Sequence, residues 1–171
     1  MKSLLSSAKR FWIPIIIIGL LAVLFLNLNT KKPAPEMTFT TISGQKISMS
    51  SLKGQVVMIN FWATDCPGCI AEMPKLIETY REYHAKGLEI IAVAMPTDPI
   101  NQVQSYTEKN QLPFPVVHDG DAKITRNFDD VRLTPTTFMI DQQGRLMGKI
   151  IGEIDFVALK NQLNKSLAIN Q

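Results

Sequence analysis

The sequence predicts an α/β domain in which helices flank a central mixed sheet, preceded by an N-terminal transmembrane helix. Two apolar runs of strand length, residues 56–62 and 88–94, enclose a segment with helical apolar periodicity at residues 67–86. Such strand–helix–strand units require a parallel part of the sheet. A turn sequence between residues 136 and 151 adds an antiparallel hairpin. The apolar run 11–28 reaches roughly 27 Å as a helix, close to the thickness of a bilayer core.

The remaining elements follow from local patterns. Residues 39–48 alternate around Ser43-Gly44, which predicts a hairpin. Pro74 is expected to kink the first long helix, and Gly87 to end it. The later elements are a helix at 101–110, a strand at 116–117, a helix at 121–128, strands at 136–140 and 145–151 and a closing helix at 154–167.

The positive charge of the chain lies at its N-terminus. Lys2, Lys9 and Arg10 precede the apolar run, and they account for the whole net charge of +3. Basic residues before a spanning segment keep the N-terminus in the cytoplasm. The residues after 28 lack the small side chains of a signal-peptidase site, which favours an uncleaved anchor over a cleaved signal peptide.

This pattern divides the chain into four parts. Residues 1–10 are cytoplasmic, 11–28 form a single-pass signal anchor, 29–37 form a linker held extended by prolines, and 38–171 form the catalytic domain. The domain is therefore expected outside the cytoplasm, at the cytoplasmic or inner membrane and in the periplasm where there is one. No basic cluster with interleaved aromatic residues occurs beyond the anchor, so nucleic acid is not an expected partner.

The two cysteines of the chain both lie in Cys66-Pro67-Gly68-Cys69. Two are too few for a disulfide scaffold, and neither histidine stands at zinc-ligand spacing, so no metal and no cofactor are expected. The motif follows a buried strand and begins a helix, where unpaired N–H groups and the helix dipole favour a thiolate. This placement predicts a redox-active disulfide in which Cys66 attacks a substrate and Cys69 resolves the mixed disulfide.

Other residues near the pair are candidates for the site. Glu72, three residues past Cys69, is either a proton carrier for that thiol or a solvated helix charge. Pro135 begins a strand and can be cis or an ordinary trans turn proline. The residues expected to contact a substrate are Trp62, Pro67, Gly68 and Thr134, although a tryptophan at this position is more often part of a core.

The chain resembles the TlpA/ResA-like branch of the thioredoxin-like proteins. The residues that carry the resemblance are Asn60-Phe61-Trp62-Ala63-Thr64, the two cysteines, Glu72-Met73-Pro74, Thr134-Pro135-Thr136-Thr137-Phe138 and Asp141-Gln142-Gln143-Gly144. The resemblance covers roughly residues 36–168. It implies a thioredoxin-like fold with a central insertion and an extracytoplasmic thiol–disulfide oxidoreductase.

The resemblance also implies roles. Cys66 would attack, Cys69 would resolve, Glu72 would be a buried carboxylate that moves protons, and Pro135 would be a cis-proline facing the disulfide. Many members reduce protein disulfides in cytochrome c maturation and are recharged by a membrane electron donor of the thiol–disulfide type. Asp65 and Ile70 depart from the family pattern, where an aromatic and a basic residue are usual, and this leaves redox potential and partner choice open.

Three other functions compete with a protein-disulfide reductase. An oxidase would run the same exchange in reverse, and the sequence does not fix the direction. A thiol peroxidase would share the fold, but Cys69 and the Trp62 motif argue against it. A non-catalytic module could bind copper(I) through the two thiolates.

Overall fold

A computed structural model describes residues 16–21 and 31–168 of the chain. The chain divides into two units, Met1–Lys32 and Pro33–Gln171. Of the predicted anchor, residues 16–21 are helical and their side chains are exposed, and the rest of the span lies outside the described residues, as does the segment 1–10. Within the described residues, no helix has the length and apolar character required to cross a bilayer.

The second unit is built on a five-stranded sheet of strand order β5-β4-β3-β6-β7. β3, β4 and β5 run parallel, and β6 and β7 are antiparallel to their neighbours. This arrangement confirms the mixed sheet that the sequence predicts. The strands are β3 (Val56–Trp62), β4 (Leu88–Ala94), β5 (Val116–His118), β6 (Thr136–Ile140) and β7 (Leu146–Ile151).

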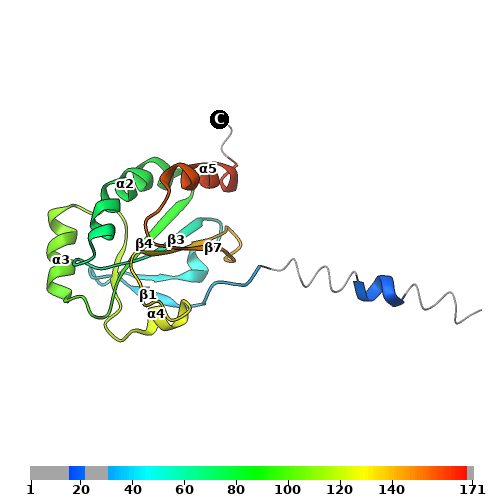
Figure 1. Ribbon diagram of the computed structural model, residues 1–171, viewed down its shortest axis with the longest axis horizontal. Helices are drawn as coiled ribbons and strands as arrows, with labels where there is room; N and C mark the ends of the chain where they lie inside the picture. Colours follow the sequence, from blue (N-terminus) through cyan, green and yellow to red (C-terminus); the bar gives the residue numbers. More distant parts are fainter. Residues whose placement is uncertain (1–15, 22–30, 169–171) are drawn as a thin grey trace, which may run out of the picture. The chain divides into compact units, whose positions relative to one another are not determined.

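The central strand β3 is buried on both faces, because its side chains alternate between two hydrophobic cores. Met58 and Trp62 contribute to the core under helices α2 (Pro67–Tyr83) and α5 (Phe156–Ser166). Ile59 and Phe61 contribute to the core on the opposite face. That second face is covered by the β1–β2 hairpin and helix α4 (Figure 1). Their bounds are β1 (Thr38–Thr40), β2 (Lys46–Ser48), η1 (Met49–Leu52) and α4 (Lys123–Asn127).

Helix α2 places the cysteine motif at the carboxyl end of β3. The helix is unbroken at Pro74, continues as a 3₁₀ turn, η2 (His84–Lys86), and ends at Gly87, whose φ of 104° lies in the left-handed region. A residue other than glycine would be strained there, which is why the chain stops the helix at this point. The predicted end of the helix is thereby confirmed.

The segment between β4 and β6 contains helix α3 (Ile100–Lys109), strand β5 and helix α4. Helix α3 packs its Val103 into the same core as α2, and β5 extends the sheet by pairing with β4. Next to the start of β7, part of the predicted linker 29–37 pairs with the domain. Pro33 bridges Arg145, and the Ala34 N–H donates to the Gly144 carbonyl at 2.9 Å.

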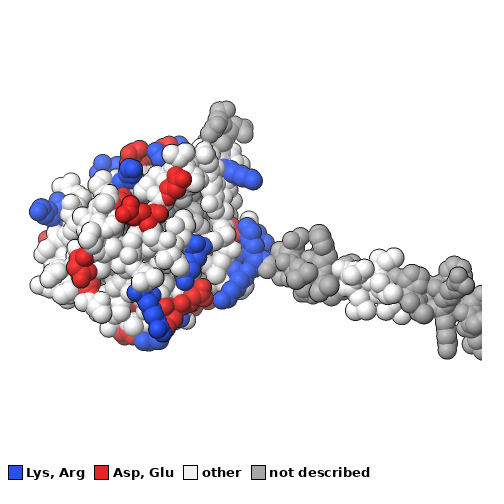
Figure 2. All heavy atoms as spheres, viewed as in Figure 1, with Lys and Arg blue, Asp and Glu red and all other residues white. Residues whose placement is uncertain are grey.

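One face of this unit carries mixed charge. On the face shown in Figure 2, acidic and basic side chains are interspersed, with no extended surface of one sign. Interspersed charges largely cancel beyond a Debye length, about 8 Å at physiological salt. On this face, the charge that a partner meets is therefore set by the side chains closest to its point of contact.

Candidate active site

Cys66 and Cys69 form a disulfide at the first turn of α2. Cys66 is the N-cap residue, and its Sγ accepts a hydrogen bond from the Cys69 N–H at 3.2 Å. Cys66 is partly exposed, whereas Cys69 has no exposed surface. A substrate disulfide can therefore reach only the Cys66 sulfur, and this asymmetry supports the predicted order of attack and resolution.

The electrostatics around Cys66 favour a thiolate once the disulfide is reduced. The sulfur sits at the positive end of the helix dipole and accepts from an N–H group of the first turn. Both interactions are stronger with a negative sulfur than with a neutral thiol, so they stabilise the thiolate form of Cys66. Asp65 is exposed, so solvent weakens its repulsion of the thiolate.

The Thr134–Pro135 peptide is cis, as the resemblance implies, and it lies against the cysteine motif. A Cβ atom placed on Gly68 would stand 3.6 Å from the Pro135 Cδ and 3.2 Å from the Glu153 Oε1. Gly68 thus allows the first turn of α2 to approach both side chains closely. Thr134 is partly buried and Pro67 is exposed, so both can border a bound substrate.

Glu72 is buried on the side of α2 that faces the sheet, with 4% of its surface exposed. Its Oε1 accepts a bond from the Asn60 amide at 3.2 Å, and its Oε2 accepts one from the Ile154 N–H at 3.2 Å. Burial raises the pKa of Glu72, the two hydrogen bonds oppose the rise, and the nearby Glu153 carboxylate adds to it. Of the two interpretations of Glu72, this geometry favours the buried proton carrier over the solvated charge.

Asn60 gives Glu72 a partner in either protonation state. Its Nδ2 donates to Glu72 and, at 3.0 Å, to the Thr137 hydroxyl, while its Oδ1 is buried without a hydrogen-bond partner. If the amide turns over, Oδ1 can accept from a protonated Glu72 and from the same hydroxyl, because a carboxylic acid and a threonine can both donate. The network therefore accommodates a carboxyl group that gains and loses a proton.

The structure corrects the expected role of Trp62. Its side chain is fully buried in the core that also contains Cys69, and its ring packs on Tyr106 with centroids 5.2 Å apart. The alternation of β3 directs this side chain under the helices, so it cannot touch a substrate from this position. Trp62 is instead a residue of the hydrophobic core.

Asp98, which no sequence motif singled out, fixes the loop that leads to Cys66. Its buried carboxylate accepts a bond from the Thr64 N–H at 2.7 Å and another from the Thr64 hydroxyl at 2.6 Å. Thr64 follows β3 and Asp98 follows β4, and the carboxyl ends of neighbouring parallel strands meet at one edge of a sheet. The expected parallel pairing of these two strands was the feature of the sequence that could have placed Asp98 beside the site.

Replacing Asp98 with asparagine is expected to destabilise the protein and loosen the active-site loop. An amide offers one acceptor atom where two donors converge, so one of the two charge-assisted bonds from Thr64 is lost at a cost of about 1–3 kcal/mol, although the hydroxyl can still donate to the Gln102 Oε1 at 3.1 Å. Urea unfolding of the oxidised chain measures this loss, and Thr64→Ser, which keeps both donors, is the matched control. Equal stability of Asp98→Asn and the wild type would contradict the assignment.

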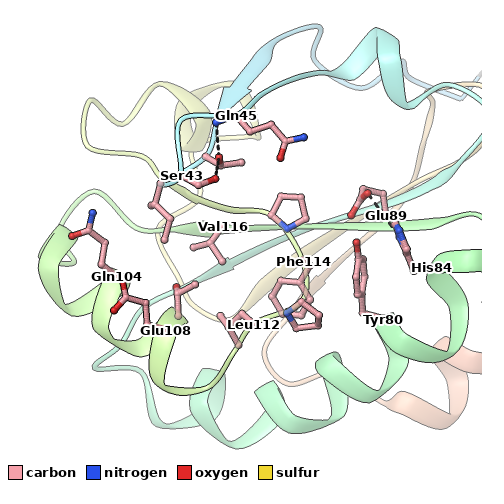
Figure 3. Close-up of a pocket in the computed structure, with 15 residues that line it drawn as sticks. Ser43, Gln45, Tyr80, His84, Glu89, Gln104, Glu108, Leu112, Phe114 and Val116 are labelled. Atoms are coloured by element: carbon pink, nitrogen blue, oxygen red, sulfur yellow. Dashed lines mark hydrogen bonds and ion pairs between the residues drawn. The ribbon is translucent and has the colours of Figure 1, made fainter.

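A separate pocket lies toward the other end of α2 and contains neither cysteine (Figure 3). It encloses about 600 Å³ and is lined by residues including Tyr80, His84, Glu89 and Glu108. Burial raises the pKa of Glu89, and the carboxyl group is bonded to the Ile90 N–H. In the part of the chain that the structure describes, no three or more His, Cys, Asp or Glu side chains are grouped to hold a metal ion.

A thioredoxin-like sheet with a cysteine pair at a helix N-terminus and a cis-proline against it defines a thiol–disulfide oxidoreductase. Comparisons with known proteins agree. The Redoxin family model matches residues 29–163. The thiol–disulfide oxidoreductase ResA of a Bacillus cereus strain is 40% identical over 134 residues, which is 78% of this chain and 76% of that protein.

Two further proteins extend the comparison. ResA of Bacillus subtilis (strain 168) is 31% identical over 138 residues, 81% of this chain and 76% of that protein. The crystal structure of a thiol:disulfide interchange protein of the thioredoxin family from Chlorobium tepidum TLS superimposes with a TM-score of 0.74 at 26% identity, covering 81% of this chain and 97% of that one. The chain belongs to the redoxin family and, within it, to the thiol–disulfide oxidoreductases of the ResA type.

Proposed function

We propose that this protein reduces disulfide bonds of other proteins outside the cytoplasm, tethered by residues 11–28. The observation that carries the proposal is the difference in exposure between the two cysteines of the pair. This difference assigns the attack on a substrate to one cysteine and the resolution of the mixed disulfide to the other. The accessible Cys66 meets the substrate, and the buried Cys69 waits one helical turn on. Glu72, buried three residues further along the same helix, is close enough in sequence to serve Cys69.

The reaction starts from the dithiol. The Cys66 thiolate attacks one sulfur of the substrate disulfide, forms a mixed disulfide and releases the other sulfur as a thiolate, which takes up a proton. Cys69 then passes its proton toward Glu72 and attacks the Cys66 sulfur. The second substrate sulfur leaves as a thiolate, which takes up a proton, and the Cys66–Cys69 disulfide forms. Two electrons move from the protein to the substrate, and Pro135 lies against Gly68 of the cysteine motif.

The disulfide must be reduced again before another turnover. We propose a membrane electron donor of the thiol–disulfide type, since the partly exposed Cys66 sulfur of the disulfide is open to attack by an incoming thiolate. Thiol reduction for cytochrome c maturation is the pathway proposed from the family resemblance. The basic N-terminal flank and the apolar run 11–28 support a cytoplasmic N-terminus and an extracytoplasmic domain.

Equilibration with glutathione tests the direction of the exchange. We expect a reduction potential nearer that of thioredoxin, about −270 mV, than that of a strong oxidant such as DsbA, about −120 mV. The reduced full-length chain is also expected to accelerate the reduction of insulin disulfides. A potential close to the strong oxidants would overturn the reductase assignment and favour the oxidase.

A further inference from the structure

Glu153 lies beside the reactive disulfide although it is distant from the motif in sequence. The backbone on each side of it is anchored to the site. The Gly152 N–H donates to the Pro135 carbonyl at 2.8 Å, and the Ile154 N–H donates to Glu72 at 3.2 Å. These two bonds hold the loop between β7 and α5 over the first turn of α2, so the position of Glu153 is fixed by the fold.

The side chain of Glu153 points at the cysteine motif. Its Oε1 stands 3.2 Å from the place of a Cβ atom on Gly68, the residue between Pro67 and Cys69. The residue is nevertheless exposed to solvent. A substrate that reaches Cys66 across Gly68 and Pro135 therefore meets this carboxylate.

The charged side chains on the segments that form the site are all acidic. These segments, residues 62–74, 133–140 and 152–155, contain no lysine or arginine. They contain four carboxylates, Asp65, Glu72, Glu153 and Asp155, of which Glu72 is buried and the others are exposed. On these three segments, the charge that a substrate meets is therefore that of the exposed carboxylates.

We propose that Glu153 determines substrate preference by charge, favouring disulfides whose cysteines are flanked by cationic groups and disfavouring those flanked by anionic groups. The inference rests on the proposed function, because it requires Cys66 to exchange with a substrate disulfide. One unit charge at roughly 6–7 Å through water changes an association by about threefold. Moderate salt reduces the effect, since the carboxylate is exposed.

The test compares two small probe disulfides of opposite charge, cystamine and 3,3′-dithiodipropionate. The rate at which the reduced full-length chain reduces each is measured for the wild type, Glu153→Gln and Glu153→Lys. The probes differ in intrinsic reactivity, and this difference cancels when the cation-to-anion rate ratio is compared between variants. Glu108→Gln is the matched control, since that carboxylate lines the remote pocket on α3 (Figure 3).

We expect the cation-to-anion ratio to fall roughly threefold to tenfold in Glu153→Gln, and further in Glu153→Lys. The ratio should stay at the wild-type value in Glu108→Gln, and 0.5 M salt (an order-of-magnitude choice, with a Debye length of about 4 Å) should compress the wild-type ratio. An unchanged ratio in both Glu153 variants, with exchange intact, would overturn this inference alone. Failure of the wild type to react with either probe would instead overturn the proposed function and the inference with it.

Discussion

Replacing Cys66 with serine is expected to reduce disulfide exchange to the uncatalysed background. The hydroxyl of serine does not ionise near neutral pH, and Cys69 has no exposed surface from which to attack a protein substrate. A loss of about 10³-fold or more is the scale found when a catalytic nucleophile is removed. The rate of insulin reduction measures this loss. The reduced wild type is the reference protein, because it lacks the Cys66–Cys69 disulfide just as the variant does.

Cys69→Ser is the companion variant and should behave differently. Cys66 keeps its place at the helix N-terminus, so the first exchange still occurs, but no thiol is left to resolve the mixed disulfide. A substrate should therefore remain covalently attached to Cys66 and appear as a single adduct by mass spectrometry. Accumulation of the adduct on Cys69 in Cys66→Ser, and not on Cys66 in Cys69→Ser, would reverse the two roles.

Replacing Glu72 with glutamine is expected to slow the resolution step by about 10²-fold, at the lower end of general acid–base catalysis. The attack by Cys66 should be much less affected, because that sulfur loses its proton to solvent. Rapid mixing of the reduced chain with oxidised glutathione separates the two steps in a single turnover. Formation of the Cys66–glutathione mixed disulfide reports the attack, and its decay reports the resolution. Glu78→Gln, an exposed carboxylate on the same helix, is the matched control.

The pH dependence of stability gives Glu72 a second, independent readout. Burial raises the folded-state pKa of this carboxyl group, so its contribution to stability is fully present below the ordinary carboxyl pKa. As the pH rises through the folded-state pKa, the unfolded chain has already released the proton that the folded chain retains, and stability falls. The unfolding free energy of oxidised Glu72→Gln should therefore fall less between pH 4 and pH 8, taken as rough limits of that range. A slope equal to that of the wild type would show that Glu72 titrates normally.

Several features of this protein are local, and the sequence predicts them well. The bounds expected for β3 and β4 agree with the structure, because a strand buried on both faces is a continuous apolar run. The start of α2 follows from the cysteine motif and its proline, and its end from Gly87. The position of Cys66 at a helix N-terminus, which gives the thiol its reactivity, is thus contained in a short stretch of sequence.

Other features depend on segments that only the fold brings together. Glu72 owes its raised pKa to burial, and its hydrogen bonds come from Asn60 on β3 and from Ile154, a residue 82 positions away. Helical periodicity shows that Glu72 shares a face with Cys69, but it does not show what covers that face. For the same reason the sequence leaves both a proton carrier and a surface charge open at this position.

The cysteine pair, its place at the junction of strand and helix and the mixed sheet around it were determined by sequence alone, since each depends on neighbours along the chain. Tertiary structure decided the cis peptide at Pro135, the burial of Trp62 and the approach of Asp98 and Glu153. Those contacts join strands and loops far apart in sequence. The electrostatic environment of a sulfur or a carboxyl group is the sum of such contacts, so it is fixed only when the chain has folded.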